Sequence, residues 1–244
     1  MGRVKIARKS TFIDMTAMSD VTVLLLTFFM LTSTFLAKEP VTVITPASVS
    51  EIKVPTSNVA SVLVSPEGKV YLAVLGEADL ASYDESWSSE GVRKEALLSA
   101  ARKYEEVTGK KTGITTADAE KFAKLGTFGV PLAKMHEFLA LDQAKQDEFM
   151  GDMANADAGI PMTDIVYQNA DGAREITNEF QIWMRAIYNS GNSNLQDAMK
   201  KGEGIAVKAD RGTNYSTLHQ ILDNLQTIKM NRFSVMTALK TEND

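Results

Sequence analysis

Cysteine is absent from the 244 residues, and histidine occurs only twice. The first absence excludes disulfides, thiolate metal sites and cysteine nucleophiles, although it does not fix the cellular compartment. His136 and His219 each stand alone, without a second ligand at a metal-binding spacing such as HExxH. We therefore expect both histidines to be structural, and the chain to hold neither a metal nor a cofactor.

Acidic side chains are missing from the first 13 residues, which hold four cations: Arg3, Lys5, Arg8 and Lys9. Removing these cations and the acids Asp14 and Asp20 from the totals of 26 and 31 leaves 22 cations and 29 acids over residues 38–244, a net charge of −7. A basic head and an acidic body are typical of a membrane-anchored protein. The body has no basic patch, so we expect no nucleic-acid partner.

No charge at all occurs between Val21 and Ala37, and residues 15–37 contain a single charged side chain. At 1.5 Å per residue, such a helix spans a hydrocarbon core of roughly 30 Å. The pattern predicts a transmembrane helix over residues 15–37. The cations place residues 1–14 in the cytoplasm by the positive-inside rule, and the remainder on the other side of the membrane.

Two alternatives to an anchor remain open for this apolar run. A cleaved signal peptide would explain the cationic head, but the run is long and Phe35 stands where a small residue is needed for cleavage after Ala37. A buried helix of a soluble fold would be apolar on every side at the very start of the chain. A membrane anchor is favoured, because it is consistent with the length of the run and with a helix that is apolar on every side.

Asp20 stands at the front edge of the apolar run, and polar residues follow it at helical spacing. Thr16, Asp20, Thr27 and Thr34 are separated by four, seven and seven residues, so they share one helix face. A polar stripe suits a helix that faces partner helices or a hydrated path. Because desolvation disfavours a charged carboxylate, Asp20 could be neutral against protein or lipid and charged against water. The alternative is an idle, solvated Asp20 at the headgroup level, as we expect for Asp14.

Two segments resemble the ExbD/TolR family of biopolymer transport proteins. The segment IDMTAMSDVTVLLLTFFMLTSTF, residues 13–35, is similar to the family's transmembrane signature of Asn or Asp, Thr-Pro, Asp-Val and a Leu-rich run that ends in Phe-Met. The segment IAVKADRGTNYSTLHQILDNLQTIKMNRFSVMTAL, residues 205–239, resembles its closing strand–helix–strand unit. Together they cover roughly a third of the chain. The family's proline is Ala17 here, and a threonine common near the outer end of the helix is Ala37.

The resemblance implies a motor subunit with Asp20 as the proton carrier and with Thr27, Thr34 and Thr16 as candidates for a proton relay. Family members form homodimers whose helices stand in the lipid membrane inside a pentamer of an ExbB-like or TolQ-like protein. Protons that cross the inner membrane drive a motion, which the periplasmic domain passes to a TonB-like protein. The resemblance therefore implies a transport role energised by the proton motive force.

The rest of the chain predicts an α+β fold. Residues 38–58 form a proline-interrupted linker, and residues 59–240 a periplasmic domain of the α/β sandwich type with helices on one face of a sheet. Runs at 62–64 and 70–74 flank a Pro-Glu-Gly-Lys turn and predict a hairpin. The closing unit predicts a strand over 205–208, a helix over 215–227 capped by Thr213 or Asn214, and a strand over 233–237.

An insert at about residues 78–202 reads as mostly helical. We expect helices over 95–106, from an N-cap at Thr116 to about Leu125, and from Pro131 to about Leu141. A further helix should bury one apolar face, formed by Ile176, Phe180, Trp183, Met184 and Ile187. This insert resembles that of the enlarged ExbD-like proteins of Bacteroidota.

No motif indicates an enzyme, since the chain has no nucleophile elbow, phosphate-binding loop or EF-hand spacing. Within the family, a TolR-like role in envelope maintenance or a gliding or secretion motor would use the same chemistry. A membrane-tethered periplasmic binding module with an idle Asp20 is the alternative from another functional class.

Overall fold

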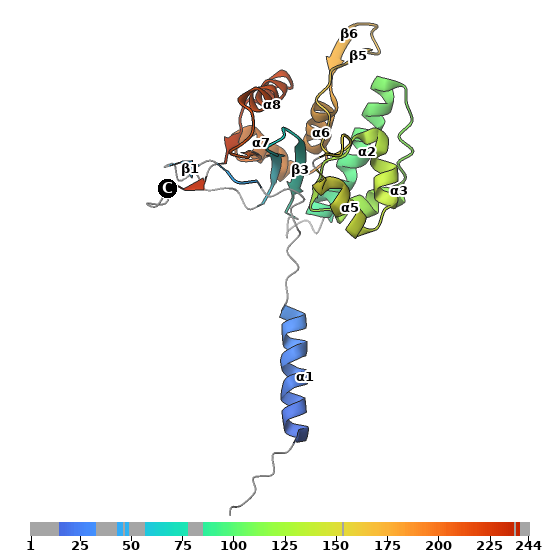
Figure 1. Cartoon of the computed structure of the whole chain (residues 1–244). Helices are drawn as coiled ribbons and strands as arrows, with labels where there is room; N and C mark the ends of the chain where they lie inside the picture. The colour runs from blue at the N-terminus through green and yellow to red at the C-terminus, as the bar shows by residue number, and fades with distance from the viewer. Residues whose placement is uncertain are drawn as a thin grey trace, which may run out of the picture. The chain divides into compact units, whose positions relative to one another are not determined.

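The structure, a computed structural model, describes residues 15–32, 43–45, 47–48, 57–77, 85–152, 154–236 and 238–239. The chain divides into two compact units, Met1–Ala37 and Lys38–Asp244 (Figure 1). The fold class is a mixed α+β arrangement of helices and sheet, as the sequence predicts. The expected segments at residues 1–14 and 33–37 lie outside the described residues.

In the first unit, helix α1 runs over Met15–Thr32. Its large apolar side chains, Val21 to Leu26 and Phe28 to Leu31 among them, are each between 55% and 87% exposed. Its hydroxyl side chains bond to the helix's own carbonyls, as Thr22 does to Met18 O at 2.7 Å. Among the described residues, no helix combines the length and apolar character that crossing a membrane requires.

In the second unit, a five-stranded sheet has the order β4-β3-β2-β7-β8. Its strands are β2 (Val59–Val64), β3 (Val70–Leu75), β4 (Thr127–Phe128), β7 (Ile205–Ala209) and β8 (Ser234–Val235). The predicted hairpin is confirmed, because β2 and β3 pair antiparallel from Val59↔Leu75 to Val64↔Val70. Gly68 takes the positive φ of 83° in the connecting turn. Strands β2 and β7, and β7 and β8, pair in parallel.

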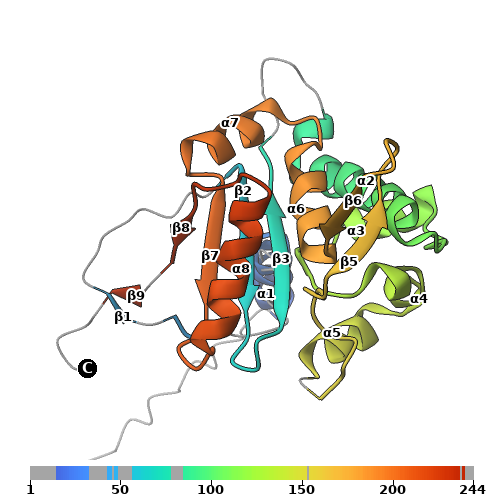
Figure 2. The same cartoon turned by 90° about the horizontal axis from the view of Figure 1, so that it is seen from above.

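One face of the sheet is covered by helices. On that face Val62, Leu72 and Val207 lie side by side in the register and are fully buried. Helix α8 (Tyr215–Thr227) lies across this face in Figure 2, beside α6 (Glu179–Tyr188), with which it is in contact. On the opposite face Ser61, Ala73 and Lys208 are half-buried. Leu63, Tyr71 and Ala206 on that same face are buried, and the Tyr71 hydroxyl donates to Met150 O of α5 (Gln143–Gly151) at 3.1 Å.

The region between β3 and β7 supplies most of the helices and also a small hairpin. The elements are η1 (Glu85–Trp87), α2 (Ser89–Thr108), α3 (Thr116–Ala123), η2 (Leu132–Lys134), α4 (Met135–Ala140), α5 (Gln143–Gly151), β5 (Ile165–Gln168), β6 (Arg174–Thr177) and α7 (Ser193–Lys201). Strand β4, from the same region, pairs with β3 at the edge of the main sheet. The insert is therefore part of the sheet and of its core.

Several details of the prediction are wrong. Thr115, not Thr116, caps α3, because its side chain accepts the Asp118 N–H in a capping box. Ile176 is 60% exposed on β6, outside the buried face of α6, because the helix begins only at Glu179. The last predicted strand shortens to β8, which lies at a sheet edge, and Thr237 lies outside the described residues. Strand β9 (Ala238–Leu239) pairs instead with β1 (Ala47–Ser48).

Candidate functional site

Helix α1 brings three of the four candidate residues onto one face. Thr16, Asp20 and Thr27 lie within its continuous helical span. At 100° per residue their directions fall within an arc of about 40°. Thr34 lies outside the described residues, as does Ala37, where the family's outer hydroxyl is missing. The predicted polar stripe is therefore present over its described part.

The polar groups of α1 differ in how they are satisfied. Ser19 donates to Met15 O at 2.8 Å, Thr27 to Leu24 O at 2.9 Å and Thr32 to Phe28 O at 2.7 Å. Such back-bonding is how hydroxyl side chains are accommodated in an apolar medium. The carboxylate of Asp20 has no hydrogen-bond or ion-pair partner among the described residues. Asp20 is also the one acid of the described helix.

The spacing limits how protons could travel along this face. Asp20 and Thr27 are seven residues apart, which is about 10 Å along a helix axis. A proton cannot pass directly between groups at that separation, because hydrogen bonds join heavy atoms about 3 Å apart. A relay through Thr27 would therefore require water molecules or side chains of another helix between the two groups.

In the second unit, Asp210 fastens the described part of the linker. Its Oδ2 accepts the Ile44 N–H at 2.7 Å, and Arg211 N donates to Ile44 O at 2.7 Å. Its Oδ1 accepts the Gly212 N–H at 2.7 Å, which holds the turn that leads toward α8. Val43, next to Ile44, is only 7% exposed. Asp210 belongs to the 205–239 segment that resembles the family's closing unit, but nothing in the sequence named Ile44 as its partner.

Replacing Asp210 by Ala is expected to speed hydrogen exchange at the Ile44 amide by about 10- to 100-fold, because a bond to a charged acceptor contributes about 1.5–3 kcal/mol. Exchange followed by mass spectrometry on the full chain in detergent would measure this. Asp223→Ala is the matched control, since Asp223 is an exposed acid of α8 that pairs only with His219 among the described residues. Equal exchange at Ile44 in both variants would contradict the assignment.

Glu179 is a buried acid that the sequence analysis did not single out. It is the first residue of α6, is 6% exposed, and accepts the Leu132 N–H at 2.9 Å. Burial raises its pKa to about 7, against an opposing effect of the Leu132 hydrogen bond. The signal available in the sequence was an acid at the start of the apolar run of α6, directly after the N-cap Asn178.

The pH dependence of stability should reveal this carboxyl group. The pKa of Glu179 is about 7 in the folded chain, whereas that of an ordinary solvated glutamate is 4.5. Between these pH values the folded chain therefore keeps a proton that the unfolded chain loses. The resulting stabilisation is present at low pH and is lost as the pH rises to 7. From pH 5 to 8, the wild type should lose on the order of 2 kcal/mol relative to Glu179→Gln, at about 1.4 kcal/mol per pKa unit.

Urea unfolding of the full chain in detergent at both pH values gives this difference. Glu175→Gln is the control of opposite sign, because hydrogen bonds from Tyr167 and Asn169 lower the pKa of Glu175. The stabilising effect of the ionised Glu175 carboxylate in the wild type is present at higher pH and is lost as the pH falls. A pH profile that is the same for wild type and Glu179→Gln would show that Glu179 titrates normally.

Each of the two histidines pairs with an aspartate. His136 Nδ1 lies 2.9 Å from Asp118 Oδ2, and His219 Nδ1 lies 2.8 Å from Asp223 Oδ2, with both imidazoles about half exposed. Within the described ranges, no three His, Asp or Glu side chains come together in a way that could hold a metal ion. The pairs are local links, between α3 and α4 and within α8.

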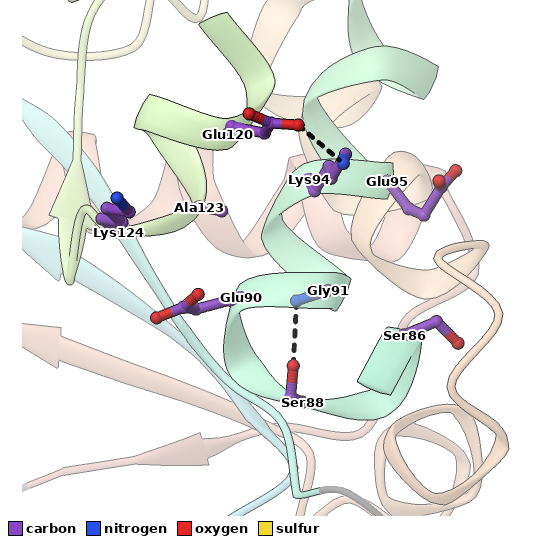
Figure 3. A pocket seen from close by; sticks show the side chains of 9 residues that line it. All are labelled: Ser86, Ser88, Glu90, Gly91, Lys94, Glu95, Glu120, Ala123 and Lys124. Atoms are coloured by element: carbon purple, nitrogen blue, oxygen red, sulfur yellow. Dashed lines mark hydrogen bonds and ion pairs between the residues drawn. The ribbon is translucent and has the colours of Figure 1, made fainter. Parts of the chain in front are cut away.

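A cavity of about 660 Å³ lies between the N-terminal half of α2 and α3 (Figure 3). Ser88 caps α2 by accepting the Gly91 N–H at 3.1 Å, and Lys94 lies 3.6 Å from Glu120. The charged side chains around the cavity, including Glu90, Glu95 and Lys124, carry both signs and are largely exposed. This arrangement does not select one kind of ligand.

Comparison with models of protein families matches residues 7–126 to the family described as biopolymer transport protein ExbD/TolR. The matched range contains α1 with Asp20, the β2–β3 hairpin, α2 and α3. Comparisons with curated proteins and with solved structures gave no match.

Proposed function

Because residues 7–126 make the chain a member of the ExbD/TolR family, we propose that it is an ExbD-like motor subunit driven by the proton motive force through reversible protonation of Asp20. Membership assigns the chain to the energy-transduction subunits of biopolymer transport, which are anchored in the inner membrane and are not enzymes.

The observation that carries the proposal is the setting of Asp20. It is the one acid in the described helix α1, surrounded by exposed apolar side chains, and the described residues offer it no partner. A carboxylate in such a position is neutral when apolar groups or lipid surround it and ionises when it meets water. Each change of state alters which environment the helix prefers, and this couples a proton to a movement of α1.

The assembly that we propose is the one that family membership implies. Residues 15–37 cross the inner membrane, residues 1–14 lie in the cytoplasm, and residues 59–240 form a periplasmic domain after the linker 38–58. Two copies of α1 stand inside a pentamer of an ExbB-like protein, which supplies the path to Asp20, and the domain passes the motion to a TonB-like protein. One charge supplies about 2.3 kcal/mol per 100 mV, so several protons are needed for each work cycle. Thr27 and Thr34 are the candidates for a proton relay on the periplasmic side of Asp20, and Thr16 is the candidate on its cytoplasmic side.

Purification tests the assembly. The full chain, extracted from its native membrane in mild detergent, should elute with a larger multi-helix protein, because the apolar side chains of α1 need a protein or lipid partner. Asp20→Asn should elute with the same protein, since the amide keeps the shape of the carboxylate, and this separates assembly from proton chemistry. A chain that elutes alone and monomeric would contradict the proposal.

A further inference from the structure

A second cavity, of about 400 Å³, lies in the insert, away from the residues that the proposed motor function uses. It is bounded by the C-terminal end of α2, the segment that leads into β5, and the start of α6. Its lining includes Val107, Pro161 and Ile165, which are apolar, and Tyr104, Thr108 and Glu179, which are polar. A cavity of this size accommodates one long side chain or a small molecule.

Glu179 is the acid of this cavity and is held rigidly. Asn178 caps α6 by accepting the Gln181 N–H at 2.9 Å, and it donates to Asn224 of α8 at 2.6 Å. Gln181 donates to the same oxygen of Asn224 at 2.8 Å. These buried bonds fix the first turn of α6, and therefore the position of the carboxyl group that begins it.

The carboxyl group lacks a cation. Its one hydrogen bond in the described structure comes from Leu132 N, and no described Lys, Arg or His forms an ion pair with it. Tyr104 and Lys110 are the other titratable groups that line the cavity, both from the C-terminal end of α2 or just beyond it. A buried carboxylate normally has a cation or several donors, because desolvation of an unpaired charge is costly. Glu179 has neither among the described residues, and it lines the cavity.

An exposed apolar pair adjoins the cavity. Val166, which lines it, pairs across the β5–β6 hairpin with Ile176, so the two side chains lie on the same face. They are 48% and 60% exposed. Figure 1 shows this hairpin extending beyond α6, where another chain could reach it. A free amine in the cavity would leave this apolar pair uncovered, whereas a polypeptide segment would cover it.

We propose that this cavity binds a lysine or arginine side chain from a segment of a partner protein, with the cation on Glu179 and flanking apolar residues on Val166 and Ile176. The cation supplies the charge that the carboxylate lacks, and the apolar flanks cover exposed surface. The inference is independent of the chemistry of Asp20 and assigns a docking function to the insert.

Binding at this site is linked to pH. The Glu179 carboxyl, with a pKa of about 7, must be ionised to pair with a cation. Its charged fraction falls from about nine tenths at pH 8 to about one tenth at pH 6, so affinity for a cationic segment should fall about ninefold. Tyr104 stays neutral over this range because burial raises its pKa further, and Lys110 is the other titratable side chain that lines the cavity.

The test uses the full chain in detergent and the peptide acetyl-Leu-Lys-Leu-amide, with binding measured by calorimetry. The neutral peptide with norleucine in place of lysine should bind at least tenfold more weakly. Glu179→Gln keeps an acceptor for Leu132 N–H and should lose at least tenfold in affinity for the lysine peptide. Glu175→Gln removes a charge from the face of the hairpin opposite Val166 and Ile176, and should change the affinity less than twofold. Lys110→Gln removes a repelling charge without touching the core and should tighten binding two- to threefold.

A further experiment tests the role of Val166 and Ile176, and whether the cation belongs to a protein segment or to a small molecule. Val166→Ser combined with Ile176→Ser should weaken the lysine peptide several-fold and leave lysine amide unaffected. Equal binding of the lysine and norleucine peptides, or unchanged binding to both Glu179→Gln and Lys110→Gln, would overturn the proposal. Lysine amide that binds as tightly as the peptide would overturn docking of a protein segment in favour of a small-molecule site.

Discussion

Asp20→Asn is expected to lower energised transport at least about 100-fold, the scale on which removal of an essential proton-transferring group acts. The amide keeps the size of the carboxylate and its hydrogen-bonding capacity, but it cannot gain or lose a proton near neutral pH. In wild type, loss of the proton changes the charge of α1 and therefore the environment that it prefers. With Asn at this position, α1 has a single charge state. The proton gradient therefore cannot change the environment that the helix prefers.

The measurement is uptake of a substrate that depends on the proton motive force, in cells that produce the variant at the wild-type level. Asp14→Asn is the matched control, because it removes another carboxylate six residues earlier in the chain. We expect that control to retain most of the activity. Normal uptake in Asp20→Asn would show that Asp20 is an idle acid. A loss of uptake in both variants to the same extent would assign the effect to charge at this end of the helix.

Trp183→Ala should have the largest effect on the second unit, costing about 3–5 kcal/mol of the free energy of unfolding. Trp183 is fully buried, with its ring 4.7 Å from that of Phe128 in β4 and 5.6 Å from that of Phe122 in α3. The cluster joins the edge of the main sheet to two helices of the insert. Removing the indole leaves a cavity at the point where the insert and the sheet share their core.

Urea unfolding of the full chain in detergent, followed by circular dichroism, measures this cost. Tyr215→Ala is the control, because Tyr215 is an aromatic residue that is 73% exposed, and its loss should cost about 0.5 kcal/mol or less. The cost of Trp183→Phe should lie between those of Trp183→Ala and Tyr215→Ala. The indole N–H has no acceptor among the described residues, so removal of this buried donor offsets part of the lost packing. A cost below 1 kcal/mol for Trp183→Ala, or an insert that unfolds before the sheet, would show that the two do not share a core.

The elements that could be predicted from sequence are those with a strong local signal. The strand at 205–209 and the helix over Tyr215–Thr227 follow from β-branched residues, a capping Asn214 and apolar residues at helical spacing. The hairpin follows from two apolar runs around a Pro-Glu-Gly-Lys turn. The buried residues Phe180, Trp183, Met184 and Ile187 follow from the period of α6. Ile176 was assigned wrongly to this face because periodicity alone does not show where a strand gives way to a helix.

The sites divide in the same way. Asp20 could be found from the sequence, because a single acid beside a long run without charges is unusual. This pattern can be recognised without coordinates. Glu179 could not, because its burial depends on Leu132, Tyr104 and Ile165, which are separated from it by 14 to 75 residues along the chain. The partner of Asp210 was hidden for the same reason, since Ile44 lies 166 residues away.

The sequence by itself determined the class of this protein: a basic head, an apolar helix with one acid, an acidic α+β body, and the family signature around Asp20. Only the tertiary structure decided that the insert completes the main sheet through β4, that Asp210 fastens the described part of the linker, and that Glu179 lines a cavity with no ion-pair partner among the described residues. The physical reason is the sequence separation of the residues that interact. Composition and periodicity report interactions within one element, whereas the environment of a buried charge is set by residues that only folding brings together.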